Sequence, residues 1–414
     1  MTISYVTLNP HDPVIARDSR PFGAGIRMKS LDWPYPSVLA GSVRTALGKR
    51  HDGKFDPEAV EALKKISVHG PLPVISNNLY FPAPKDILVK DAGGSGDETY
   101  AIRPASLSDD GEGCDLPYSG LQPPMLSSRA ADEFKPATIA SLWSADIMAA
   151  WLVNPDGVRF NAPRVRKEGK KKTVQEPDGF DLPAKESRFH SAIDPGSGTA
   201  KDRMLFETVG LDLSLKNPYA MMGISARVET DINSRFNATG FEDINPFGGE
   251  RRLSFWRSEE QSPSGGECPP VVVGELKKAK LIRMILATPA IFSQGWLPGW
   301  IDTTTLTGTP PCAPENNEGK ICLRLVSACV ERWKPLSGFS LEKGKEGPKP
   351  LRRVVPAGSV YFFRSESGDT GDLAKCWLRP VSDDVQDTMD GFGLAIWGIW
   401  DIEHDNSAES QKKE

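Results

Sequence analysis

The chain has 414 residues, more than one ordinary hydrophobic core organises, and 39% of them are hydrophobic, so we expect a globular protein with two domains. Its 38 glycines and 35 prolines imply many turns and long loops, which argues against a helical bundle. The formal net charge of -5 excludes a uniformly basic coat, so any nucleic-acid binding must come from local patches.

The cysteines and the short motifs narrow the class of protein further. The six cysteines form no C-x-x-C pair and no secretory segment opens the chain, so we expect reduced thiols and a cytoplasmic protein. No apolar run reaches the roughly 20 residues of a membrane span. None of the five histidines stands in H-E-x-x-H, and no phosphate-binding Walker loop occurs, so the sequence predicts no metal site and no cofactor.

The first third of the chain predicts one strand and three helices. Apolar alternation over 3–8 indicates a strand. Helical spacing predicts a helix over 36–48, with Ser37 as its N-cap, and further helices over 57–65 and 138–153. The Gly, Ser and Asp-rich segment 90–122 is typical of a loop.

A β-hairpin with a long loop is predicted after residue 183. Two segments of period two, 188–193 and 204–213, flank the turn-rich residues 194–202. Lys201 and Arg203 near this tip are candidates for phosphate contacts, with apolar residues beside them. The alternative is that Leu205 and Phe206 belong to the core and that the tip is only a mobile loop.

A second unit is predicted from residue 241 onward. Its strands are expected at 253–256, 279–286, 321–332, 358–363 and 391–400, before a polar, disordered tail at 405–414. Helices between these later strands are few. Two tandem α+β units, at 1–240 and 241–404, therefore explain the pattern better than a Rossmann sheet.

Residues 245–256 place a diglycine, Gly248 and Gly249, just before Arg251 and Arg252. Glycines let main-chain amides approach a phosphate, and two guanidinium groups can then hold its oxygens. A Gly-Gly turn leading into a strand whose arginines face water is the commoner use of these residues. Both interpretations stay open on this segment alone.

Three further features have two interpretations each. The segment 159–190 holds nine Lys or Arg against five acids, which suits either RNA contact or a solubilising loop. His190 is of the residue type that most often shuttles protons, but it has no recognisable catalytic partner, so a hydrogen bond to a phosphate is the simpler role. Gly391, Phe392 and Gly393 are typical of an ordinary bulge before a buried strand; the other interpretation, RNA contact with Phe392 stacking on a base, is implied by the family resemblance given below.

Five segments in this order, 16–23, 36–48, 190–210, 245–256 and 390–398, resemble one protein family. The chain resembles the third Cmr subunit of type III-B CRISPR effector complexes, within the RAMP superfamily of guide-RNA-binding proteins. The resemblance runs from about residue 4 to about residue 400. It implies an α+β fold of two tandem ferredoxin-like (RRM-like) RAMP domains with long loop insertions and a β-hairpin thumb at about 188–213.

The resemblance also implies a function. A noncatalytic RNA-binding subunit in antiviral defence would hold the 5′ repeat-derived tag of the CRISPR RNA (crRNA). It would dock onto the large palm-domain subunit and the first backbone subunit, and meet target RNA only indirectly. The RNA-binding candidates are Arg17, Arg20, Arg27, Ser37, Arg44, His190, Lys201, Arg203, Gly248, Gly249, Arg251, Arg252, Gly391, Phe392 and Gly393.

Two alternatives remain at this stage. Some RAMP relatives process crRNA as endoribonucleases, and here His190 would be the general acid or base. In the other alternative, the glycine loops and the ten tryptophans serve only protein interfaces, and the chain is a scaffold without RNA contact. Incubating the protein with labelled crRNA separates all three functions.

Overall fold

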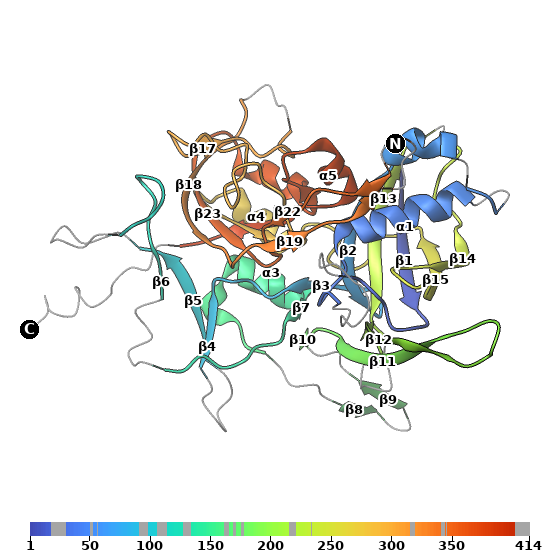
Figure 1. Ribbon diagram of the computed structural model, residues 1–414. Helices are drawn as coiled ribbons and strands as arrows, with labels where there is room; N and C mark the ends of the chain where they lie inside the picture. The colour runs from blue at the N-terminus through green and yellow to red at the C-terminus, as the bar shows by residue number, and fades with distance from the viewer. Residues whose placement is uncertain are drawn as a thin grey trace, which may run out of the picture.

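The computed structural model describes most of the chain: residues 1–17, 30–49, 53–55, 57–90, 98–105, 114–126, 134–160, 165–168, 171–174, 178–214, 221–232, 234–314, 319–340, 344 and 346–401. Its elements form a mixed α+β fold built on two large sheets whose recorded strand pairings are antiparallel (Figure 1). The predicted tail at 405–414 lies outside the described residues.

The first large sheet has eight strands in the order β10-β7-β3-β2-β13-β1-β15-β14. Along β1 and β15 buried residues alternate with more exposed ones, as in strands covered on one face, whereas the central β2 and β13 are buried at nearly every position. In chain order its strands are β1 (Thr2–Pro10), β2 (Ser67–Ile75), β3 (Asn78–Pro82), β7 (Leu142–Ser144), β10 (Gly179–Phe180), β13 (Gly223–Thr230), β14 (Glu242–Pro246) and β15 (Leu253–Glu259).

Helix α1 (Pro36–Lys49) covers the inner face of this sheet. Its buried stripe, which includes Leu39, Val43 and Leu47, packs with the inward residues of β1, β13 and β15 in one hydrophobic cluster. The helix begins at a proline, whose missing N–H and fixed φ suit a first helical position. Ser37 therefore lies within the first turn, and its prediction as the N-cap is wrong. The short η1 (Pro57–Ala59) and α2 (Val60–Lys64) follow where a helix was predicted.

The second large sheet has six strands in the order β17-β18-β23-β16-β25-β24. Helices α3 (Ala145–Val153), α4 (Pro270–Leu276) and η4 (Thr370–Cys376) pack beside it, and α5 (Val385–Asp390) lies toward the first sheet (Figure 1). The strands are β16 (Leu281–Leu286), β17 (Thr307–Gly308), β18 (Cys322–Cys329), β23 (Val360–Ser367), β24 (Arg379–Pro380) and β25 (Leu394–Ile399).

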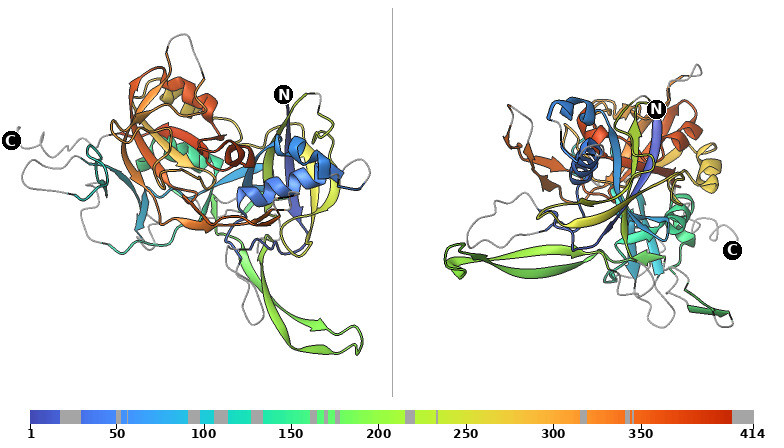
Figure 2. Two further views of the ribbon diagram at one scale, coloured as in Figure 1. Left: turned by 45° about the horizontal axis from the view of Figure 1, so that its top comes forward. Right: turned by 90° about the vertical axis from the view of Figure 1, so that its right-hand side faces the viewer.

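Smaller sheets lie around these two large sheets. The longest is the hairpin of β11 (Ala184–Ile193) and β12 (Ala200–Asp212), which projects away from both large sheets (Figure 2). One further sheet contains β4 (Ile87–Lys90), β5 (Glu98–Pro104) and β6 (Pro124–Leu126). The remaining sheets are pairs: β8 (Val165–Glu168) with β9 (Lys171–Val174), β19 (Lys334–Leu336) with β22 (Arg352–Val354), and β20 (Phe339–Ser340) with β21 (Gly347–Pro348). A short helix, η3, spans Pro155–Gly157.

The pairing of strands corrects three of the predicted boundaries. Strands β14 and β15 belong to the first sheet, so the sheets divide after Glu259 and not at residue 240. The predicted helix 138–153 starts only at Ala145, because β7 occupies the preceding residues and the Ser144 hydroxyl accepts from the Ile147 amide. Segment 90–122, predicted as a loop, contains β5.

The two halves of the chain also share a core and buried charges. Phe81, Trp143 and Trp151 from the first half lie in the same hydrophobic cluster as the second sheet. The guanidinium of Arg283 on β16 is fully buried against Asp86, with Nη1 2.7 Å from Oδ2. Because an unpaired charge is costly inside a protein, this ion pair ties the segment after β3 to the second sheet.

Candidate nucleic-acid interface

Residues 13–17, which follow β1, connect two of the predicted RNA-binding segments. On one side, the amides and carbonyls of Val14 and Leu211 exchange hydrogen bonds of 2.8 Å, which attaches the base of the β11–β12 hairpin. On the other side, the Gly249 amide donates to the Ile15 carbonyl at 2.7 Å. The structure therefore brings the hairpin, the diglycine turn and the start of the Arg17 loop together, although they are far apart in the sequence.

The hairpin carries apolar side chains on its exposed surface. Phe189 is 71% exposed and Leu205 is 63% exposed. The pairing of Phe189 with Glu207 and of Ser191 with Leu205 puts both apolar side chains on one face. Ile193 and Met204 are exposed as well. The prediction of a hairpin is thus confirmed, and the alternative that Leu205 is a core residue is wrong.

His190 lies on the opposite face of the hairpin. Its ring stacks on Phe206, its cross-strand partner, with the centroids 5.2 Å apart and the planes at 17°. Its Nε2 is 2.8 Å from the Thr208 hydroxyl. Among the described residues, no carboxylate, lysine or second histidine forms a recorded hydrogen bond with this imidazole.

The tip of the hairpin, 194–199, is a compact turn. The Asp194 carboxylate accepts from the amides of Gly196, at 2.8 Å, and Ser197, at 3.0 Å, and these bonds lower the pKa of the carboxyl group. The Asp194 amide in turn donates to the Thr199 carbonyl. Lys201 is exposed just after the tip, and Arg203 lies two residues further along β12.

The diglycine lies against a neighbouring backbone. A Cβ on Gly248 would approach the Ile15 carbonyl oxygen to 2.5 Å, and the Gly249 amide is already bonded to that oxygen. These glycines therefore permit close packing of two chain segments, which is the structural role that their sequence left open. After them, Glu250 and Arg251 adopt positive φ in a tight turn; Arg251 is exposed, whereas the Nε of Arg252 is buried and unpaired in the described structure.

The remaining arginines of the prediction differ in their surroundings. Arg17 is exposed and its backbone pairs with Ser30, while Arg20 and Arg27 lie outside the described residues. Arg44 on α1 is largely buried, and its guanidinium donates to the Asp390 carboxylate and to the carbonyls of Ile66 and Met389. Arg44 therefore joins α1 to α5 in this structure.

The segment Gly391, Phe392 and Gly393 is buried between the two sheets. Phe392 has no exposed surface and packs in a cluster with Tyr35, Leu336 and Val354, so the prediction that it stacks on a base is wrong. Gly391 ends α5 with φ 92°, and a Cβ there would approach the Val68 carbonyl oxygen to 2.5 Å. The glycines thus let α5 end against β2.

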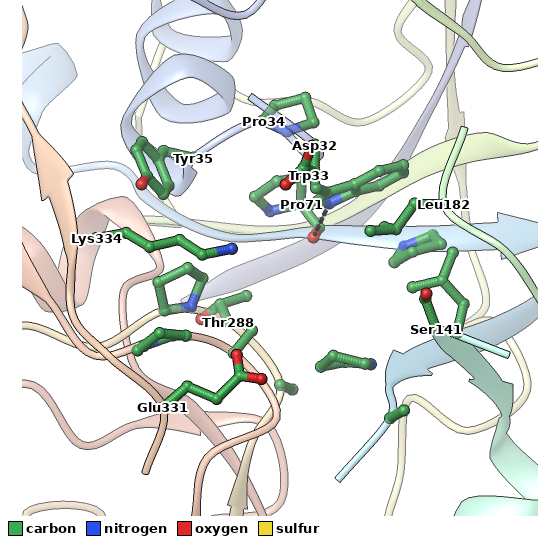
Figure 3. A pocket seen from close by; sticks show the side chains of 18 of the residues that line it. Asp32, Trp33, Pro34, Tyr35, Pro71, Ser141, Leu182, Thr288, Glu331 and Lys334 are labelled. Carbon is green, nitrogen blue, oxygen red and sulfur yellow. Dashed lines mark hydrogen bonds between the residues drawn. The ribbon is translucent and has the colours of Figure 1, made fainter. Parts of the chain in front are cut away.

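Sequence reasoning missed a cavity at the junction of the sheets. It measures about 250 Å³ and is lined by residues before α1, by prolines of β2 and β3, and by the segments around Thr288 and Lys334. Figure 3 shows the Lys334 amino group reaching into it below Trp33, whose indole donates to the Pro71 carbonyl. Leu182, just before the hairpin, also lines the cavity. Only tertiary structure brings these segments together, so no local pattern predicted it.

Within the described ranges, no three His, Cys, Asp or Glu side chains gather as a set of metal ligands. In that same part of the chain, no helix has the length and apolarity needed to cross a membrane.

Comparisons with known proteins identify the family. The family model described as CRISPR-associated protein (Cas_Cmr3) matches residues 6–400, whereas no curated protein matches the chain. Among solved structures, a chain of the type III-B Cmr-beta complex bound to cognate target RNA and AMPPnP is 13% identical, with 86% of each chain covered and a TM-score of 0.43. A chain of the Csm3-Csm4 subcomplex of the type III-A interference complex is 12% identical, with 88% of this chain and 94% of that chain covered and a TM-score of 0.34. Because the family match spans nearly the whole sequence, this chain belongs to the Cas_Cmr3 family of CRISPR-associated proteins.

Proposed function

We propose that the chain is a noncatalytic RNA-binding subunit of a type III-B Cmr effector complex, and that it holds the 5′ repeat-derived tag of the crRNA. One observation carries the proposal: the β11–β12 hairpin projects from the body and exposes large apolar side chains. Exposing Phe189 and Leu205 to water contributes nothing to folding, whereas an unpaired base can stack on the Phe189 ring and pack against Leu205.

The charge of the hairpin supports base contact over simple phosphate attraction. Between residues 184 and 212 the sequence holds four Lys or Arg and five Asp or Glu. A hairpin without net positive charge draws little affinity from counterion release. The contact therefore depends on apolar and aromatic surface, with Lys201 as a local phosphate partner near the tip.

The proposal includes two tandem ferredoxin-like RAMP domains. Strands β15-β1-β13-β2 of the first sheet and β25-β16-β23-β18 of the second follow the same order, the fourth, first, third and second strand of each unit. The first unit keeps the helix between its first two strands, α1, and the second unit keeps α5 between its last two. Each unit is then a ferredoxin-like fold that keeps one of the two usual helices.

The proposed partners are the large palm-domain subunit and the first backbone subunit, with target RNA met indirectly. The outer face of β14 and β15 exposes Ile244, Leu253 and Phe255, which offers apolar area for a protein neighbour. This assignment rests on the family resemblance, and loss of one subunit from the purified complex on changing these residues to Ser would support it.

We infer a noncatalytic role from the surroundings of His190. RNA cleavage through the 2′-hydroxyl transfers protons at both the attacking and the leaving oxygen, and the recorded partners of the His190 ring, Thr208 and Phe206, supply no second acid or base. His190→Ala should leave RNA cleavage by the assembled complex intact. A loss of cleavage by about 10² to 10⁴, with assembly preserved, would favour the endoribonuclease alternative.

The RNA-binding role is tested with the double variant Phe189→Ala and Leu205→Ala. Both side chains are exposed, so the variant should fold normally, while the dissociation constant for tag-containing crRNA should rise. Loss of one stacking contact corresponds to about 1 to 3 kcal/mol, or roughly fivefold to 150-fold in affinity. Val385→Ala on α5, an equally exposed apolar site away from the hairpin, is the matched control. Equal affinities for both variants would contradict the proposal.

A further inference from the structure

A second cavity adjoins the junction cavity. The first measures about 250 Å³ and the second about 590 Å³, and both have Glu331 and Val354 in their walls. These two adjoining cavities, which share that wall, are here called the junction groove. It starts beside Leu182 and Asp32 at the hairpin base, and it ends beside Trp333 and Arg353.

Aromatic side chains line both parts of the junction groove. Trp33 and Tyr35 lie in the first part, and Trp296 and Trp333 in the second. Trp333 is 41% exposed, and the Arg353 guanidinium lies 4.8 Å from the centre of its ring. Water solvates an exposed indole ring poorly. An indole with a planar cation beside it is a surface on which nucleobases stack.

The lining of the groove is more basic than the chain as a whole. Lys85, Arg332, Lys334 and Arg353 outnumber the two carboxylates, Asp32 and Glu331, although the whole chain carries a formal charge of -5.

Both groove carboxylates are already neutralised. Asp32 pairs with Lys185 at 2.6 Å, and Glu331 pairs with Lys85 at 3.0 Å. No carboxylate among the described residues forms a recorded ion pair with Arg332, Lys334 or Arg353. These cations are therefore available to an anionic ligand.

A buried hydroxyl in the second part of the groove also lacks a partner. Ser327 lines the wall and is 2% exposed, and its Oγ has no hydrogen-bond partner within the described structure. A buried polar group without a partner is costly, and a ligand atom in the groove would satisfy it.

We propose that the junction groove binds a single-stranded stretch of RNA that continues from the hairpin base, with one base stacked on Trp333 and with Arg332 and Lys334 at its phosphates. The inference rests on the proposed RNA-binding function and extends it across the second sheet. Phe392, although buried, has a role in it, because it packs behind Tyr35 and Val354 and supports the groove wall.

Equilibrium binding of a labelled synthetic crRNA, with tag and guide segments, to the full-length chain tests the groove. Trp333→Ala should weaken binding roughly fivefold to 150-fold and leave its salt dependence unchanged. Lys334→Ala should instead lower the slope of log K against log salt concentration by about 0.7, the value for one phosphate contact on a single strand, and Lys334→Arg should restore it. Trp333→Phe should keep part of the affinity.

The matched control is Phe55→Ala, a similarly exposed aromatic, 37%, in the segment between α1 and η1. If Trp333→Ala and Phe55→Ala bind RNA equally while the Phe189 and Leu205 double variant is weakened, the groove inference is wrong and the proposed function stands. If the hairpin variant also binds RNA with wild-type affinity, both the groove inference and the proposed function are wrong. If Trp333→Ala releases a protein subunit from the complex but binds RNA normally, the groove is a protein surface and the inference is overturned.

Discussion

His69 shows how a single buried residue makes stability depend on pH. Burial, with the nearby charge of Arg227, lowers its pKa from 6.5 to about 3, so the folded protein keeps this imidazole neutral. The Glu229 carboxylate, 4.0 Å from Nδ1, serves Arg227 and Arg379 as their ion-pair partner. This cluster joins β2 and β13 of the first sheet to β24 of the second.

The neutral His69 predicts acid sensitivity. Below pH 6.5 the His69 imidazole binds a proton in the unfolded chain but not in the folded chain. The free energy of unfolding should therefore fall as pH falls, by at most about 1.4 kcal/mol per pH unit. Chemical denaturation between pH 6.5 and pH 5 should show this slope, and His69→Gln should reduce it. An identical slope in the variant would assign the pH dependence to other groups.

Gly391 is the residue at which a small substitution should be most harmful. Its φ of 92° and the close approach of its Cα to Val68 leave no room for a side chain, so Gly391→Ala should destabilise the protein by at least about 1 to 2 kcal/mol. Gly41→Ala on α1 is the control, since nothing lies within 4 Å of its added Cβ and alanine favours a helix. Thermal melts should separate the two variants; equal melting temperatures would refute the packing role of Gly391.

At the scale of the element, the hairpin can be shortened without losing its strands. Ile193 pairs with Ala200, so replacing residues 194–199 by Asn-Gly gives a two-residue turn that suits a hairpin. Loop-closure entropy changes slowly with length, and stability should stay nearly constant. In the assembled complex, the chemical reactivity of the crRNA near the junction of tag and guide should change. A wild-type reactivity pattern would show that the tip is an ordinary surface turn.

The elements predicted correctly are those with a strong local period. Alternation gave β1 and both strands of the hairpin, and helical spacing gave α1, because these patterns report directly which side chains are buried. Ser37 and Gly391 show the limit of such reasoning. Ser37 is not a cap because the helix already starts at Pro36, and Gly391, which in sequence could equally belong to an open loop, lies against β2.

At the scale of the whole molecule, the two sheets should unfold together. Asp86→Asn would leave the buried Arg283 without its carboxylate. The free energy of unfolding should fall by about 3 to 5 kcal/mol, because water does not reach the buried charge. Glu366→Gln removes the carboxylate of the exposed Arg324 pair and should cost no more than about 1 kcal/mol. Denaturation should show a single transition in both variants. Two separate transitions would mean that the shared core does not couple the sheets.

The RNA-binding role is tested most directly by ultraviolet cross-linking of crRNA to the chain within the assembled complex, with the cross-linked peptides identified by mass spectrometry. Nucleotides at the junction of tag and guide should cross-link to the hairpin, at Phe189 and the residues beside it, and peptides of the outer face of β15 should carry no cross-link. Cross-links confined to surfaces away from the hairpin, or none to this chain in a complex that retains its crRNA, would contradict the proposed RNA-binding role.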